Sequence, residues 1–182
     1  MDLESRRFLL RAAHPDLAGP LAAYYERNRM FLAPFEPVRD RSFYTPEQQA
    51  QLLRQELDRA QAGTDYRFYL FLPEQPALLI GVVGLNNLVR GCFQSCFLSY
   101  KLDQNYVNRG YMTEAVQTVV HYAFDTLALH RVEANIMPRN LPSLRVAEKC
   151  SFQSEGLARR YLRINGVWED HLHLVRLNAE LE

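Results

Sequence analysis

The stretch "DQNYVNRGYMTEAVQTVVHYAF", residues 103–124, joins a polar turn to an amphipathic helix and decides the fold. After the turn, apolar side chains recur at the spacing of one helix face, at Val116, Val119, Val120, Ala123 and Leu127. The flanking segments "SCFLSYKL" (95–102) and "HRVEANIMP" (130–138) are rich in residues that favour strands. Together the three segments predict a β-α-β unit with a turn at the start of its helix.

The turn before this helix is a candidate anion site. Backbone amides at a helix N-terminus attract phosphates, but loops of this kind need residues that tolerate positive φ, and Gly110 is the single glycine here. Asparagine is the other residue that readily adopts the left-handed region, so Asn108 can take a position that would otherwise need glycine. The amides of residues 109–112 can then converge on a pyrophosphate, with Arg109 as an added cation. The alternative is an ordinary strand-to-helix connection.

The remaining segments predict a chain of mixed α and β elements. Apolar patterning, prolines and glycines predict strands at 6–12, 66–72 and 77–88, helices over 15–29 and 45–62, a short helix after Pro142, and two final strands around an Asn165-Gly166 turn. The "PEQP" segment between residues 72 and 77 predicts an antiparallel hairpin. Leu52, Leu53 and Leu57 are expected to face the core.

Length and charge restrict the class of protein. A chain of 182 residues with 48% hydrophobic residues suits one well-filled core, so we expect a single domain over residues 1–182. The 21 basic and 21 acidic residues cancel, which argues against nucleic acid as the main partner. No stretch resembles a signal peptide or a membrane span, and we expect a cytoplasmic protein, either a monomer or a homodimer.

Neither a disulfide framework nor a metal site is indicated. Cys92, Cys96 and Cys150 are odd in number and have no clustered histidines, so we expect reduced and mostly buried thiols. His171 and His173 alternate along a strand, but no third ligand lies at a suitable spacing. These two histidines are expected on a solvated strand face.

Two long segments carry a resemblance to a known family. "NYVNRGYMTEAVQTVVHYAF" (105–124) and "HRVEANIMPRNLPSLRVAEKCSFQSEGLARRYLRINGVWEDHLHLVRL" (130–177) resemble the GNAT acyltransferases of the RimJ and RimL type, which acetylate the N-termini of ribosomal proteins. The likeness covers nearly the whole chain. It implies an α/β fold with a mixed, mostly antiparallel sheet of about seven strands, a V-shaped splay between strands 4 and 5, and about four flanking helices.

The resemblance also implies acetyl-CoA as cofactor. The family's pyrophosphate loop, Q/R-x-x-G-x-G/A, places Asn105, Asn108 and Gly110 on its three defined positions, and only Gly110 matches strictly. The pantetheine arm would pair with the fourth strand, and the side chain of Asn140 would bond to it unless it serves only as a helix N-cap. The implied cofactor-binding residues are Tyr100, Lys101, Leu102, Asn105, Asn108, Arg109, Gly110, Tyr111, Met112, Thr113, Asn140 and Ser143.

The implied catalytic residues are Ser143 and Glu133. Where many relatives have a tyrosine that protonates the leaving thiolate, this chain has Ala147, and Ser143 is the substitute unless its hydroxyl only bonds the first helical turn. The positions that hold a base in some relatives fall on Gln94 and Asn135, which cannot accept a proton. Glu133 could act through a water molecule, although an ion-paired surface carboxylate is the alternative.

This shortage of bases points to the acceptor. A peptide α-amine has a pKa of about 7.7 to 8 and a lysine about 10.4, so deprotonating lysine near pH 7 costs roughly 3 to 4 kcal/mol more. We therefore expect transfer of acetyl from acetyl-CoA to the N-terminal α-amine of a protein, most simply a ribosomal protein that begins with Ala or Ser. Two alternatives stay open: an acetyltransferase for a small amine or amino sugar, and a non-catalytic acyl-CoA-binding module.

Overall fold

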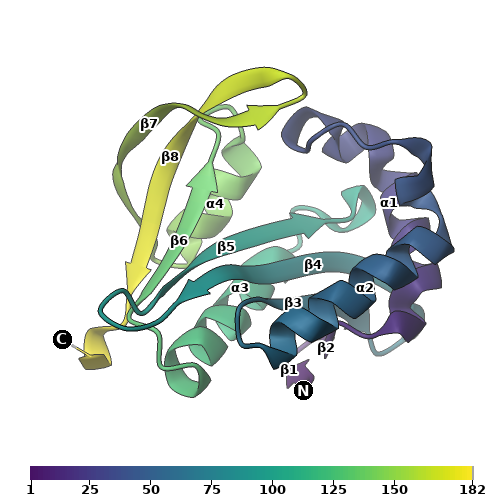
Figure 1. Cartoon of the computed structure of the whole chain (residues 1–182), viewed down its shortest axis with the longest axis horizontal. Helices are drawn as coiled ribbons and strands as arrows, with labels where there is room; N and C mark the ends of the chain where they lie inside the picture. The colour runs from purple at the N-terminus through teal and green to yellow at the C-terminus, as the bar shows by residue number, and fades with distance from the viewer. Residues whose placement is uncertain (182) are drawn as a thin grey trace.

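The computed structural model describes residues 1–181 and contains one continuous sheet of eight strands with helices on both faces (Figure 1). The strand order is β1-β2-β3-β4-β5-β6-β8-β7, and every neighbouring pair is antiparallel except β5 and β6. The strands are β1 (Leu3–Glu4), β2 (Leu9–Ala12), β3 (Tyr66–Leu72), β4 (Gln75–Val89), β5 (Ser95–Leu102), β6 (Arg131–Ile136), β7 (Gln153–Ile164) and β8 (Val167–Leu177).

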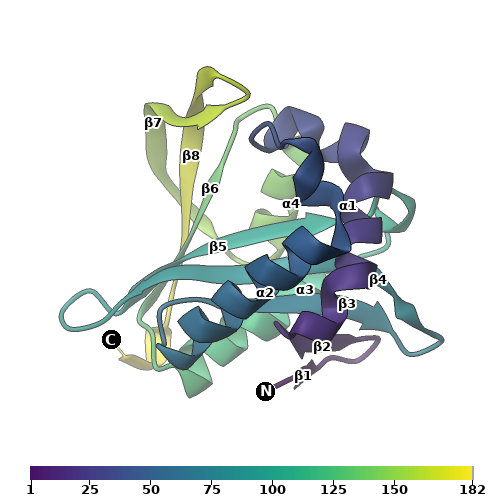
Figure 2. The same cartoon turned by 45° about the vertical axis from the view of Figure 1, so that its right-hand side comes forward.

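Four α-helices cover the sheet, two on each face (Figure 2). Helices α1 (Ala18–Leu32) and α2 (Pro46–Gln61) pack on one face, and α3 (Tyr111–His121) and α4 (Leu141–Lys149) on the other. The predicted start of α2 is confirmed, because the Thr45 hydroxyl accepts a hydrogen bond from the Gln48 amide. Within residues 1–181, none of the helices is both long and apolar enough to cross a bilayer.

The predicted mixed fold is confirmed, with two differences at the N-terminus. The strand predicted at 6–12 begins only at Leu9, because residues 5–8 form a turn in which the Ser5 amide bonds to the Phe8 carbonyl. This turn folds a two-residue strand, β1, back along β2. The short β1 explains why the sheet has eight strands where about seven were expected.

The predicted splay lies between β5 and β6. These strands pair over only three positions, Ser95–Phe97 with Arg131–Glu133, and then diverge. Figure 1 shows the two arms: the antiparallel pair β4 and β5 extends to α1 at one end, and the antiparallel pair β6 and β8 extends to the last hairpin. Beyond this point β5 remains paired with β4, and β6 remains paired with β8. The sheet therefore opens between β5 and β6 while each arm stays hydrogen-bonded.

Two apolar cores lie on the two faces of the sheet. The predicted stripe is buried against the sheet from Val116 to Leu127, and its last residues lie in and after a π-helical turn, Tyr122–Thr126, that follows α3. On the other face, only Leu53 of the three leucines predicted for α2 is fully buried, and Leu52 and Leu57 are half-buried. The carboxylate of Glu56 is also buried there and bonds to Arg67 and to the Tyr69 hydroxyl, a polar link between α2 and β3 that the helical pattern did not reveal.

The last hairpin curves over the splay. The pairing of β7 with β8 shifts register between Ala158 and Leu162, and Arg160 in this interval has a φ of 49°. Such an irregularity bends the strand and increases its twist. The predicted Asn165-Gly166 turn forms the tip, with both residues at positive φ.

A buried carboxylate joins α1 to the end of β5. Asp103 is fully buried, and its Oδ2 accepts hydrogen bonds from Arg27 Nε at 2.5 Å and from Asn28 Nδ2 at 3.1 Å. Its Oδ1 accepts from the Asn105 amide at 2.9 Å. The Asn28 side chain in turn accepts from the Gln104 amide at 2.9 Å. These bonds fix the chain where the polar turn before α3 begins.

We expect Asp103→Ala to lower the free energy of unfolding by about 3 to 5 kcal/mol, because it leaves Arg27 and Asn28 without their buried partner. Urea denaturation would measure the change. Asp16→Ala is the matched control, since Asp16 also pairs with an arginine, Arg11 at 2.9 Å, but its side chain is 52% exposed. Its loss should cost less than about 1 kcal/mol. Equal losses in the two variants would contradict the assigned role of Asp103.

Candidate active site

The turn before α3 has the backbone geometry that the sequence predicted. Asn108 has a φ of 61° and Gly110 a φ of 76°, so both adopt the left-handed region, and Gly110 is the N-cap of α3. The expectation that Asn108 stands where glycine would otherwise be needed is confirmed. A Cβ added to Gly110 would lie 3.5 Å from Arg7 Nη2, an ordinary contact distance. Space therefore does not exclude a side chain at this position, and the positive φ is what favours glycine.

The helix that follows presents free amides at its start. The first intrahelical bond runs from the Glu114 amide to the Gly110 carbonyl, at 3.1 Å. The amides of Tyr111, Met112 and Thr113 precede that bond and lie at the positive end of the helix dipole. Met112 is buried in the core, so it offers its backbone alone. This arrangement suits an anion at the mouth of the splay.

Arg7 on the neighbouring turn holds this helix start in place. Its Nη1 donates to the Arg109 carbonyl at 2.9 Å, and its Nε pairs with Glu114 Oε2 at 2.6 Å. Partial burial would raise the pKa of Glu114, but the hydrogen bond from Arg7 lowers that pKa below its usual value. Arg109 itself is exposed and lies over the Tyr106 ring at 5.5 Å. Its guanidinium therefore remains close to the candidate anion site.

One edge of β5 is open toward the splay. The Asp103 amide bonds to the Ile80 carbonyl on β4, and peptide groups alternate in direction along a strand. The amides of Tyr100 and Leu102 therefore point the other way, toward β6, beyond the last residue pair of the two strands. An extended ligand between the arms would find these groups in the position of a missing strand.

The side chain of Lys101 lies on the face of the sheet that α1 covers, beside Glu36 and Tyr25. It is 24% exposed, forms an ion pair with Glu36 and lies 5.0 Å from the centre of the Tyr25 ring. Burial alone would lower the pKa of Lys101, but Tyr25 and the Glu36 carboxylate outweigh it and raise that pKa. Lys101 therefore stays protonated and does not supply a base.

The start of α4 faces the same opening. Asn140 is the N-cap of α4, because its Oδ1 accepts from the Ser143 amide at 3.3 Å, so the N-cap alternative accounts for this oxygen. The Tyr100 hydroxyl donates to the Ser143 carbonyl at 2.7 Å, and burial raises the pKa of Tyr100. These bonds bring the half-buried Ser143 against β5, whereas Ala147 is buried in the core.

Glu133 lies at the apex of the splay and is not a surface carboxylate. It is 9% exposed and pairs with Phe97 at the last position shared by β5 and β6. Both carboxylate oxygens have partners: Arg131 Nη2 is 2.7 Å from Oε2, and His173 Nδ1 is 2.9 Å from Oε1. Direct proton abstraction by Glu133 would require one of these partners to move.

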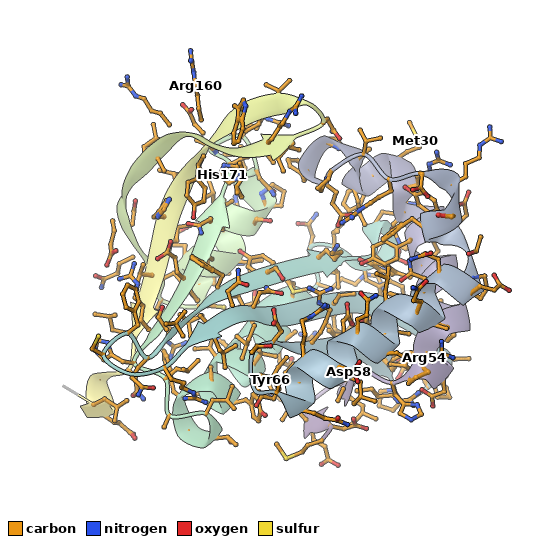
Figure 3. All side chains as sticks on the ribbon, viewed as in Figure 1. Met30, Arg54, Asp58, Tyr66, Arg160 and His171 are labelled. Atoms are coloured by element: carbon orange, nitrogen blue, oxygen red, sulfur yellow. The ribbon has the colours of Figure 1, made fainter. Side chains whose placement is uncertain are left out.

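The expected solvated face is wrong for His171, whereas the His173 side chain remains 26% exposed. His171 is 3% exposed and its Nδ1 lies 3.0 Å from the Glu169 carbonyl, and Tyr161 packs against both imidazole rings. In Figure 3 His171 lies beneath the arch of the hairpin, while Arg160 points outward into solvent. The burial arises because the curved β7 brings Tyr161 over β8, a shape that alternation along one strand does not reveal.

The loop after α1 contacts the tip of the curved hairpin. Asn165 Nδ2 donates to the Ala33 carbonyl at 2.6 Å. Arg139, between β6 and α4, donates to the Pro34 carbonyl at 3.1 Å and to Glu169 Oε1 at 2.8 Å. A hollow of about 580 Å³, part of it open to solvent, lies beside these contacts and is bordered by Tyr25, Arg29, Met30, Leu32, Ala33, Glu36, Pro37, Val38, Arg39, Tyr44 and Asn165.

The aromatic residues and thiols divide between surface and core. Trp168 is 58% exposed near the hairpin tip. Cys96 and Cys150 are buried and Cys92 is exposed, and all three are free thiols, as the sequence predicted. Among the described residues, His, Cys, Asp and Glu side chains do not gather in groups of three or more that could hold a metal ion.

Comparison with known proteins places this geometry in a family. Residues 7–153 match the acetyltransferase (GNAT) domain. The chain is 44% identical over 155 residues to the Bacillus subtilis (strain 168) protein named "Probable N-acetyltransferase YjcK", a match that covers 85% of each chain. It is 38% identical over 170 residues to the ribosomal protein uS5-alanine N-acetyltransferase of Escherichia coli (strain K12), covering 93% of this chain and 87% of the relative.

A solved structure extends the similarity to the whole fold. The ribosomal-protein-S5-alanine acetyltransferase from Vibrio fischeri superposes with a TM-score of 0.94 at 33% identity, covering 100% of this chain and 99% of that one. The splay, the turn before α3 and the sequence matches agree. The chain therefore belongs to the GNAT family of N-acetyltransferases, enzymes whose acetyl donor is acetyl-CoA, as the resemblance in its sequence predicted.

Proposed function

We propose that this protein transfers the acetyl group of acetyl-CoA to the N-terminal α-amine of a protein in the cytoplasm, with a ribosomal protein that begins with Ala or Ser as the expected acceptor. The observation that carries the proposal is the three-residue pairing of β5 and β6, followed by an open strand edge that leads to the free amides of α3. Two relatives, from Escherichia coli and Vibrio fischeri, are named for acetylating an alanine of ribosomal protein uS5 or S5.

The cofactor is proposed to lie along the open edge of β5. Its pyrophosphate would accept hydrogen bonds from the amides of residues 109–112, with the Arg109 guanidinium nearby and Thr113 at the next free amide. Its pantetheine arm would bond to the peptide groups of Tyr100 and Leu102 as a strand would. Asn105 and Asn140 are proposed at the two ends of this path; the backbone amide of Asn105 bonds to Asp103, and the side-chain oxygen of Asn140 accepts from the Ser143 amide.

Transfer is proposed to be direct. The amine attacks the thioester carbonyl carbon, the C–S bond breaks, and the departing thiolate takes a proton from the Ser143 hydroxyl. The position of Ser143 supports this role, because its main chain is held by Asn140 on one side and by Tyr100 on the other. A group held in this way needs little rearrangement before it donates its proton.

We expect Gly110→Val to weaken acetyl-CoA binding by about tenfold or more. A β-branched residue does not tolerate the φ of 76° at this position, and the turn must shift, which displaces the amides of α3. Calorimetric titration would measure the Kd. Gly91→Val is the matched control, because Gly91 has a φ of 70° in the β4–β5 turn and a Cβ there meets nothing within 4 Å. An unchanged Kd in Gly110→Val would contradict the placement of the pyrophosphate.

Asn108→Gly tests whether the asparagine acts through its backbone. If Asn108 only replaces glycine at positive φ, the change should leave the acetyl-CoA Kd nearly unaltered and shift stability by less than about 1 kcal/mol. The same titration and a thermal melt would report both quantities. A large loss of affinity would instead assign the side chain a direct contact with the cofactor.

Ser143→Ala should lower kcat by about 100-fold or more, with a much smaller effect on the acetyl-CoA Kd, because proton donation to the thiolate is needed only during the reaction. Steady-state release of CoA thiol would measure kcat. Ser154→Ala, an exposed serine on β7, is the control and should leave kcat unchanged. A kcat for Ser143→Ala equal to that of the wild type would remove the serine from the mechanism.

The preferred acceptor should be the amine that loses its proton more easily. We expect acetylation of peptides with a free N-terminal Ala or Ser and little reaction at lysine, because an α-amine, with a pKa of about 8, gives up its proton much more easily than a lysine, with a pKa of about 10.4. Mass spectrometry would locate the acetyl group. Acetyl found chiefly on lysine, or equal rates with an N-terminally blocked peptide, would overturn this acceptor and favour the small-amine alternative.

A further inference from the structure

Two neighbouring polar atoms in the splay are buried without a hydrogen-bond partner in the described structure. They are Asn135 Oδ1 on β6 and His173 Nε2 on β8. Asn135 and His173 are direct partners in the antiparallel pairing, so their side chains lie side by side on one face of the sheet. Leaving a buried polar atom unpaired costs about 1 to 3 kcal/mol, so two such atoms together indicate a place for a ligand.

The hydrogen-bonding character of His173 follows from its neighbour. Its Nδ1 lies 2.9 Å from Glu133 Oε1, and an ionised carboxylate can only accept, so Nδ1 carries a hydrogen. In the neutral imidazole Nε2 then holds a lone pair and is an acceptor. Glu133 is itself held by Arg131, which also pairs with Glu155 at 2.7 Å. The Tyr161 ring, 4.7 Å from the His173 ring between centres, limits the other movements of the imidazole.

Asn135 and His173 lie on the face of the sheet opposite α3 and α4. Val132, Ala134 and Ile136 of β6 point into the core beneath α3 and α4, and Asn135 alternates with them onto the other face. Glu133 pairs with Phe97 at the last shared position of β5 and β6, and Asn135 comes two residues later. Asn135 Oδ1 therefore lies where β5 and β6 begin to diverge, and His173 Nε2 lies beside it, one strand further from β5 on β8.

Both orphan atoms are acceptors, and the group that matches them is a primary ammonium, which has three donors and no acceptor. Resting on the proposed function, we propose that Asn135 Oδ1 and His173 Nε2 form the subsite for the acceptor's ammonium group. His173 is the catalytic base, and Glu133 is a positioning residue that sets the tautomer of His173.

The proposed step balances without any further reactant. One proton passes from the ammonium to His173 Nε2, and the freed lone pair forms the N–C bond at the thioester carbonyl. The C–S bond breaks with its electrons on sulfur, the thiolate takes a proton from Ser143, and the serine recovers one from the attacking nitrogen. The proton on His173 is released to solvent, so that acetyl-CoA and an ammonium yield an amide, free CoA thiol and one proton.

The test compares His173→Asn and Asn135→Leu with the wild type, using a lysine-free hexapeptide that begins with alanine. Asparagine at position 173 still offers an N–H donor at the place of Nδ1 for Glu133 but has no group at the place of Nε2. We expect a loss of about 100-fold to 10,000-fold in kcat/KM at pH 7 for His173→Asn. Asn135→Leu should weaken peptide binding in the presence of CoA by about tenfold or more. Acetyl-CoA Kd values should stay unchanged in both.

The pH dependence of the kcat/KM defect shows whether His173 acts as a base or only supports the structure. The defect of His173→Asn should shrink as the pH rises from 7 to 9, because the α-amine, with a pKa of about 8, then deprotonates without help. Glu133→Gln should show a smaller defect with the same trend. His121→Asn, an exposed histidine on α3, is the matched control and should behave as the wild type. A defect of His173→Asn that does not change with pH, or parallel losses of acetyl-CoA affinity, would overturn the inference.

Failure of the proposed function gives a different result. If the wild type releases no CoA thiol with the hexapeptide but does so with a small primary amine, the peptide acceptor is wrong, and the same variants are then measured with that amine. His173 and Asn135 should remain necessary for it. If the variants match the wild type with whichever amine is acetylated, or if no primary amine is bound or acetylated, the ammonium site is wrong.

Discussion

The short pairing between β5 and β6 is the constraint on which the rest of the structure depends. Strands of six and eight residues could pair over up to six positions, yet here pairing stops after three, at Phe97 and Glu133. Each strand compensates by pairing fully on its other side, so neither arm is lost. The unpaired edge of β5 then offers peptide groups to an extended ligand, and α3, which follows β5 directly, delivers its positive end to the same opening. A single interruption of hydrogen bonding thus leaves open the strand edge along which the cofactor is proposed to lie, and α3 lies at one end of that edge.

Most ionisable groups around the opening are committed to holding its walls. Asp103 joins α1 to the end of β5, Glu114 is held by Arg7, and Lys101 by Glu36. The pKa of Glu114 is lowered and that of Lys101 is raised, so these two side chains stay charged and do not act as acid or base in the reaction. The histidine beside Glu133 differs from them, since one ring nitrogen is bound and the other is left open. Chemistry in this site therefore relies on few groups, each placed by a neighbour that is already satisfied.

Local pattern predicted the β-α-β unit, the buried stripe of α3, the hairpins and the left-handed Asn108, because each depends on residues that are close in sequence. The polar contacts between distant elements could not be predicted in the same way. Glu133 meets His173 because β8 lies between β6 and β7, an order that no local period encodes. Arg27 reaches Asp103 across 76 positions of sequence. The family resemblance gave the splay and the cofactor path, while the burial of His171 needed the bend of β7, which comes from an irregular register and a positive φ at Arg160.

The contacts from Asn165 to Ala33 and from Arg139 to Pro34 have a topological consequence. They join the hairpin tip to the loop after α1, and Lys101 joins that loop to β5, so the two arms of the sheet become parts of a closed ring of chain. The free end of a chain can enter such a ring. An internal residue of a folded chain can enter it only with its side chain, and that side chain must be long enough to cross the ring. Such a ring supports the proposed choice of a chain terminus, and not an internal residue, as the acceptor, independently of the acidity of the two amines.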